Sequence, residues 1–153
     1  MSKLFIYYSF SGNGDVVSES LKNKGFEIRK VESKLKLSKN MFLQMMKGGF
    51  LSGIGAKPQL IDYDNSVDGY DEIYIGSPIW NGRLACPINT VLRDTYLKEK
   101  SVTFVLYSGS GTAKHADKKI NKLFSNSKVI HLQQPKDKKE ELKKLFEWEI
   151  KAI

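Results

Sequence analysis

Cysteine is almost absent from this chain. Cys86 is the only cysteine among 153 residues, so no disulfide can form within the chain. This excludes the disulfide-stabilised secreted folds, and because the composition suits a reducing compartment we expect a cytoplasmic protein. Thiol–disulfide exchange would need a second cysteine. We therefore predict that Cys86, next to Pro87, is a small packing residue.

Histidine is equally scarce. The chain has 2 histidines, and neither lies at metal-ligand spacing from cysteine or carboxylate residues, so we expect no metal site. His115 lies in a polar loop before a predicted helix. It could transfer protons there or remain a solvated side chain, and the sequence leaves both open. We assign no catalytic residue.

Long apolar runs are missing as well. The N-terminal run, residues 4–8, leads directly into a polar loop and is too short for an export signal. We expect no membrane span, because no uninterrupted run approaches the length that crosses a bilayer. With 41% hydrophobic residues and no low-complexity linker, residues 1–153 are predicted to form a single domain.

Acidic residues are outnumbered by basic ones. The chain has 25 Lys and Arg against 17 Asp and Glu, a formal net charge of +8. The lysines are spread along the chain and are not interleaved with aromatics in a base-stacking pattern. We therefore expect no nucleic-acid binding, and an acidic-faced redox partner protein instead. The composition leaves monomer and homodimer equally open.

Short apolar strands alternate with helical patterns along the chain. We expect strands at Leu4–Tyr8, Phe26–Val31, Ile73–Ile75, Val102–Tyr107 and Val129–Leu132. We expect helices at Val16–Asn23, Pro87–Tyr96, Ala113–Phe124 and from Asp137 to the C-terminus. This alternation predicts an α/β fold in which a parallel sheet is covered by helices on both faces.

Polar loops follow the first, third and fourth of these strands. They span Ser9–Asp15, Ser77–Leu84 and Ser108–His115, and all are rich in Gly, Ser and Asn. Ligands of open parallel sheets bind beyond the carboxyl ends of the strands, so we expect the three loops to meet at one site. The first loop opens a helix, where N–H groups and glycines can surround a phosphate. The loop after the fifth strand, residues 133–135, carries no such pattern.

The three loops resemble those of the flavodoxin-like family of FMN-binding proteins, over nearly the whole chain. The matching segments are SFSGN at residues 9–13, GSPIWNGR at 76–83 and YSGSG at 107–111. The resemblance implies a three-layer α/β/α sandwich with a five-stranded parallel sheet in the order 2-1-3-4-5. It also implies FMN as the cofactor.

By this resemblance, each loop contributes to cofactor binding. The residues around the phosphate are Ser9, Ser11, Gly12, Asn13 and Gly14. The residues of the second loop, most of which line the isoalloxazine ring, are Ser77, Pro78, Ile79, Trp80, Asn81 and Gly82. The residues that close the other edge of the ring are Ser108, Gly109 and Gly111. Trp80 is expected to stack on the ring.

The first loop departs from the family pattern [ST]-x-[ST]-G-N-T at its end. Gly14 replaces the threonine, and Asp15 follows it. The lost hydroxyl donor predicts phosphate binding weaker by about 0.5–1.5 kcal/mol, and Asp15 would repel a phosphate unless its side chain points away. The motifs G-x-x-x-x-G-K-[ST] and, after the first strand, G-x-G-x-x-G do not occur, which argues against other phosphate-binding folds.

Residues 38–64 fit the alternating pattern least well. Within them, Met41–Phe50 has a Met-rich apolar face. It predicts either a short helix over the core or a mobile flap that meets a substrate or partner.

The resemblance implies a redox protein that carries electrons through non-covalently bound FMN. One alternative is an FMN-dependent oxidoreductase acting on NAD(P)H and quinones or on porphyrinogen-type substrates, with Met41–Phe50 as its flap. A second alternative is a flavin-free binding module of the same fold, which Gly14 and Asp15 keep open.

Overall fold

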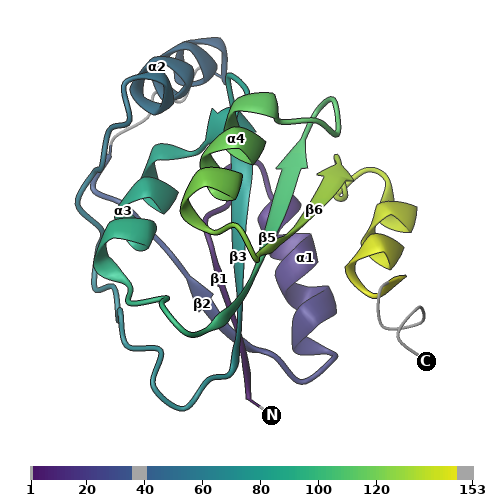
Figure 1. Cartoon of the computed structure of the whole chain (residues 1–153). Helices are drawn as coiled ribbons and strands as arrows, with labels where there is room; N and C mark the ends of the chain where they lie inside the picture. The colour runs from purple at the N-terminus through teal and green to yellow at the C-terminus, as the bar shows by residue number, and fades with distance from the viewer. Residues whose placement is uncertain (1, 36–40, 148–153) are drawn as a thin grey trace.

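A parallel sheet runs through the centre of the computed structural model, which describes residues 2–35 and 41–147 (Figure 1). Its parallel strands lie in the order β2-β1-β3-β5-β6. Their bounds are β1 Lys3–Tyr7, β2 Glu27–Lys30, β3 Glu72–Trp80, β5 Ser101–Ser108 and β6 Lys128–Gln133. Each neighbouring pair is parallel. Because β5 and β6 are the fourth and fifth predicted strands, the predicted order 2-1-3-4-5 is confirmed.

The central strands β1, β3 and β5 are buried on both faces because each carries a near-continuous apolar run. Leu4 and Ile6 of β1 enter one core, whereas Phe5 and Tyr7 enter the other. Successive side chains of a strand point to opposite faces, so a continuous apolar run needs cover on both sides. Burying each such side chain stabilises the fold by about 1.5–3 kcal/mol.

Helices supply that cover in two outer layers (Figure 1). On one face lie α1 (Asn13–Lys22) and the 3₁₀ helix η1 (Lys139–Leu145), which bring Val17, Leu21 and Leu145 to the core around Phe5. On the other face lie α3 (Cys86–Asp94) and α4 (Lys114–Leu123), which bring Ile88 and Ile120 to the core around Leu4. The three-layer α/β/α sandwich is confirmed.

The third strand is longer than predicted and ends in a hairpin. β3 continues beyond Ile75 to Trp80, so the first part of the predicted second loop is strand. The chain turns at Asn81 and Gly82, with φ of 53° and 71°, and returns as β4 (Arg83–Leu84), antiparallel to β3. Two positive φ values in a two-residue turn are typical of type I′, for which Asn-Gly is a preferred sequence.

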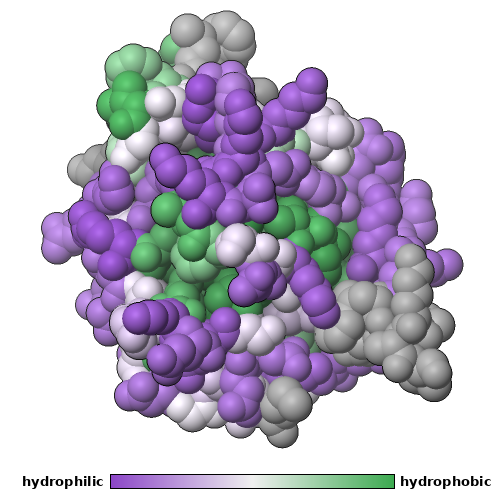
Figure 2. Space-filling view, viewed as in Figure 1, coloured by the Kyte–Doolittle hydropathy of each residue, from purple (hydrophilic) through white to green (hydrophobic). Residues whose placement is uncertain are grey.

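The helix α2 (Met41–Gly53) lies beyond the carboxyl edge of the sheet (Figure 1). The helix predicted in the Met-rich segment is present, but it lies at the edge of the sheet instead of over the core. That this segment acts as a flap stays a prediction. Leu43, Phe50 and Ile54 remain 51%, 67% and 63% exposed. Figure 2 shows this apolar surface over α2, next to a hydrophilic surface over α4.

The C-terminal prediction needs correction. The expected α-helix from Asp137 is a 3₁₀ helix over Lys139–Leu145, and its part in residues 148–153 lies outside the described residues. The first turn is held back to the sheet, because Glu141 accepts a hydrogen bond from the Gln133 N–H at 2.9 Å. In the tighter helix Leu145 still reaches the core.

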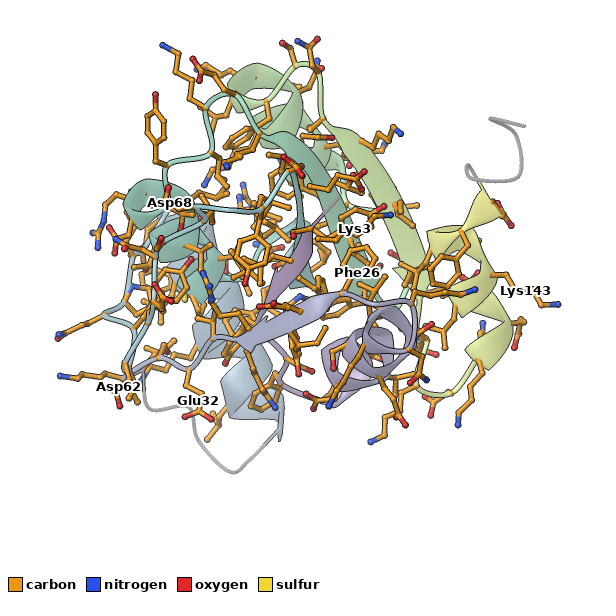
Figure 3. The ribbon with its side chains drawn as sticks, turned by 90° about the horizontal axis from the view of Figure 1, so that it is seen from below. Lys3, Phe26, Glu32, Asp62, Asp68 and Lys143 are labelled. Atoms are coloured by element: carbon orange, nitrogen blue, oxygen red, sulfur yellow. The ribbon has the colours of Figure 1, made fainter. Side chains whose placement is uncertain are left out.

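The opposite end of the sheet is closed by local packing. Figure 3 shows Lys3 and Phe26 close together in the view from below. The Lys3 ammonium lies 5.4 Å from the centre of the Phe26 ring, a cation–π arrangement.

Within the described residues no helix is long and apolar enough to cross a membrane.

Candidate functional site

The first loop closes on the start of α1. Gly12 precedes the helix with φ of 97°, a conformation that glycine adopts without strain. The Gly14 N–H donates a hydrogen bond to Ser9 Oγ at 3.0 Å, and Asn13 Nδ2 donates to Ser11 Oγ at 3.3 Å. The loop therefore folds around the helix N-terminus, where the partial positive charge favours an anion.

The glycine at position 14 is required by Tyr107. A Cβ added to Gly14 would lie 2.5 Å from Tyr107 Oη and 2.8 Å from Ser9 Cβ. The Tyr107 side chain is only 2% exposed, and its hydroxyl donates to the Tyr8 carbonyl. Burial raises the pKa of Tyr107 well above its usual value, so the phenol stays neutral. Its hydroxyl thus fills the space that a side chain at position 14 would occupy.

The Asp15 side chain is bonded to residues of β1 and β2. Its Oδ1 accepts hydrogen bonds from Tyr7 Oη at 2.8 Å and from Lys30 Nζ at 2.9 Å. Burial raises the pKa of Asp15, but the bonds from Lys30 and Tyr7 outweigh it, and the pKa lies below its usual value. The carboxylate is therefore paired with Lys30 of β2, which reduces the repulsion that the sequence suggests.

Sequence reasoning missed Lys136, which follows β6. Its backbone N–H donates to Asn13 Oδ1 at 3.0 Å, and its ammonium donates to the Ser11 carbonyl at 3.2 Å. A Cβ added to Gly12 would lie 3.4 Å from Lys136 Cδ, so the side chain crosses the loop. Lys136 therefore brings a positive charge to the predicted phosphate site. No local signal could have found it, because 125 positions separate it from Ser11.

Trp80 connects the first loop to the β3–β4 hairpin. Its ring lies edge-on to Tyr8 and Phe10, with centroid distances of 5.7 Å and 6.4 Å. On the α2 side, a Cβ added to Gly48 would lie 2.8 Å from Trp80 Cε3. The glycine thus lets α2 approach the indole closely, and the ring is fixed between the first loop and α2.

Ser77 does not reach the surface of this site. It is fully buried at 0% exposure. Its hydroxyl donates to the Pro78 carbonyl at 2.7 Å and accepts from the Ala85 N–H at 3.0 Å. The hydroxyl therefore ties the two arms of the hairpin together, and the geometry does not support a contact between Ser77 and a cofactor.

The second and third loops share a hollow of about 410 Å³. Ile79, Asn81 and Gly82 line it from the hairpin. Ser108 and Gly109 line it from the third loop, together with the exposed His115. The predicted meeting of these two loops therefore occurs, with the first loop beside them and joined through Trp80.

Two predicted residues, Pro78 and Gly111, are not among the residues that line this hollow. The Gly111 N–H donates to Ser108 Oγ at 2.9 Å, with Gly111 at φ of 75°. Pro78 lies in β3 and accepts the Ala85 N–H at 3.2 Å through its carbonyl. Both therefore hold the loops in shape.

Comparison with known proteins supports one family. The flavodoxin family model matches residues 2–149, and no curated protein sequence matches the chain. A candidate flavoprotein from Bacteroides eggerthii superposes with a TM-score of 0.76, covering 99% of this chain and 98% of its own, at 16% identity. A flavoprotein from Lactobacillus acidophilus, solved in complex with FMN, gives 0.65 over 91% of this chain and 97% of its own, at 23% identity. At these identities the structures show a shared fold, and the family match extends over almost the whole chain: this protein belongs to the flavodoxin family.

Proposed function

We propose that this chain binds FMN non-covalently and carries electrons through it. The observation that carries the proposal is the junction of the first loop with the β3–β4 hairpin through Trp80. Phe10 of the first loop and Trp80 of the hairpin lie with ring centroids 6.4 Å apart. The loop predicted to bind phosphate and the hollow thus lie side by side at the carboxyl edge of the sheet, where ligands of such folds bind.

The residues of the first loop fit a phosphate. The loop offers the hydroxyls of Ser9 and Ser11 and the start of α1, while the Lys136 ammonium lies 3.2 Å from the Ser11 carbonyl. Asp15 is bonded to Lys30 on the other side. Family membership and the FMN complex of the Lactobacillus acidophilus protein support the same ligand.

The hollow between the hairpin and the third loop fits the ring system. Its walls combine the apolar Ile79 with polar backbone at Asn81 and Gly82, a mixture common in cofactor sites. Bound FMN supplies one- and two-electron chemistry, while the protein sets access and electrostatics. The net charge of +8 favours an acidic-faced redox partner.

Titration of the flavin-free protein with FMN and with riboflavin tests this function. We expect FMN to change its visible spectrum and lose fluorescence on binding, with a higher affinity than riboflavin, which lacks the phosphate. Equal affinities would contradict the role of the first loop. The absence of any spectral change with either flavin would overturn the proposal and favour a flavin-free module.

An FMN-dependent oxidoreductase is the second candidate, favoured by the surroundings of the hollow. The exposed His115 lines it beside Gly82, and the apolar surface of α2 lies at the same edge (Figure 2). Steady-state oxidation of NAD(P)H by a quinone distinguishes the two functions. Sustained turnover supports the enzyme, whereas a carrier shows almost none.

A further inference from the structure

A second cavity, of about 300 Å³, lies next to the hollow between the β3–β4 hairpin and the third loop (called the flavin hollow below). His115 lines both. Its walls come from the end of α2, from β4, and from α3 and α4. The residues important to the argument are Ser52, Arg83, Asn89 and Lys119. The family comparison assigns nothing to this cavity.

The charge in this cavity is of one sign. Arg83 and Lys119 line it, and among its described lining residues none is a carboxylate. Arg83 donates to the neutral Asn81 carbonyl at 3.1 Å. Lys57 adds to this positive charge. Burial and the charge of Lys57 together lower the pKa of Lys119. The cavity therefore concentrates positive charge that the described part of the chain does not neutralise.

Lys119 is held toward the cavity by a neutral partner. Its ammonium donates to Asn89 Oδ1 at 2.5 Å. The Asn89 amide is fixed in turn, since Nδ2 donates to the Ala56 carbonyl at 3.2 Å and the side chain is 4% exposed. An ammonium has three N–H donors. Within the described part of the chain Lys119 uses one of them, on Asn89, which leaves others for a ligand.

Ser52 provides an independent indication of a ligand. This residue is 4% exposed and lines the cavity. Within the described ranges its Oγ has no hydrogen-bond partner. Buried hydroxyls are almost always paired, so a ligand that accepts or donates at this oxygen would complete the site.

We propose that this cavity binds a small oxyanion, a phosphate or carboxylate group, through Lys119, Arg83 and Ser52. An oxyanion would neutralise the two cations and would accept a hydrogen bond from the Ser52 hydroxyl. The site is separate from the first loop and does not depend on FMN binding. Because His115 borders both cavities, a small anionic molecule held here lies directly beside the flavin hollow.

Amide-resolved NMR titrations of the full chain test the site, using inorganic phosphate and acetate at constant ionic strength. We expect saturable shifts at Ser52, Arg83 and Lys119 with at least one of the two anions, and the anion that saturates identifies the ligand class. Phosphate can also enter the first loop, so shifts confined to residues 9–14 count against the cavity. The absence of saturable shifts at the cavity with both anions overturns the proposal.

Matched variants make the test specific. Lys119→Met keeps the packing stem and removes the charge, so we expect binding about tenfold weaker from the loss of one charge-assisted hydrogen bond. Ser52→Ala weakens binding less. Lys122→Met removes an exposed lysine from the same helix and leaves the midpoint unchanged. Equal midpoints for Lys119→Met and Lys122→Met overturn the proposal. Repeating the titrations of all three variants with FMN added shows whether they still bind the flavin. A failure of the proposed flavin function is thereby distinguished from a failure of the anion site.

Discussion

Tyr107 determines which residue can occupy position 14, far away in the sequence. Its buried hydroxyl bonds the Tyr8 carbonyl and lies where a side chain of residue 14 would project. Within the same loop, Ser9 Oγ accepts the Gly14 N–H. Packing thus accounts for the glycine at this departure from the family pattern, and Lys136 adds a positive charge to the loop.

Replacing Gly14 by alanine tests this packing. Alanine normally favours a helix over glycine by about 1 kcal/mol, but here its Cβ would meet Tyr107 Oη at 2.5 Å. We expect Gly14→Ala to lower the free energy of unfolding by about 1–3 kcal/mol, measured by urea denaturation. Gly53→Ala is the control, since its Cβ meets nothing within 4 Å. A Gly14→Ala protein as stable as the wild type would contradict the packing argument.

Removing the charge of Lys136 tests its role at the phosphate site. We expect Lys136→Met to weaken FMN binding about three- to tenfold, since a partly solvated charge–charge contact contributes about 1 kcal/mol. Fluorescence titration measures this, and the loss should shrink at high salt. Riboflavin affinity should not change, and Lys143→Met, an exposed lysine on η1 (Figure 3), should leave both affinities intact. An equal loss for both flavins would refute a phosphate contact.

The pH dependence of stability follows from Asp15. Its pKa is lowered in the folded protein, so between the folded and unfolded pKa values the unfolded chain binds more protons. The stabilisation by Asp15 is therefore present above about pH 4 and is lost as the pH falls through the folded pKa. We expect Asp15→Asn to show a smaller loss of stability between pH 6 and pH 3 than the wild type, in urea denaturation. Asp62→Asn, an exposed control, should behave like the wild type.

At the scale of elements, the β3–β4 hairpin and α2 shape the site together. The Asn81-Gly82 turn brings Trp80 to the first loop. Gly48 lets α2 pack against the indole. The sequence predicts the polar second loop, and its Asn-Gly pair is a hairpin signal. The hairpin forms because β3 continues past Ile75 to Trp80, which the short apolar run Ile73–Ile75 does not indicate.

Enlarging Gly48 tests the contact between α2 and Trp80. A Cβ at this position would lie 2.8 Å from Trp80 Cε3, so Gly48→Ala should push α2 away from the ring. In a Trp148→Phe background, where Trp80 is the only tryptophan, we expect its fluorescence emission to move to longer wavelength. Gly53→Ala on the same helix should leave the emission unchanged. An unshifted spectrum for Gly48→Ala would show that α2 does not rest on Trp80.

At the scale of the whole molecule, net charge and fold act on different properties. The charge of +8 does not specify the sheet, but it governs encounters with charged partners. The two apolar cores and the strand order place the loops at one edge. The scaffold therefore fixes where the loops meet, and the net charge affects which charged molecules approach the protein.

Small redox reagents test the effect of the net charge. If the net charge of +8 attracts anionic oxidants to the flavin-loaded, reduced protein, its oxidation by the anion ferricyanide should slow as ionic strength rises. Oxidation by a cationic complex such as hexaammineruthenium(III) should accelerate under the same conditions. Stopped-flow kinetics measures both rates. The same salt dependence for the two oxidants would contradict steering by the protein's charge.

The pattern of residues along the chain determined the alternation of strands and helices and the three polar loops, whereas the strand order came only from the resemblance to a known family. Periodicity and turn residues are local properties, and a parallel sheet then brings the loop ends together. The tertiary structure decided what local patterns do not contain: the contact of Lys136 with Ser11, the fit of Tyr107 against Gly14, the burial of Ser77 and the 3₁₀ form of η1. Each depends on residues brought together only when the chain packs around its two cores.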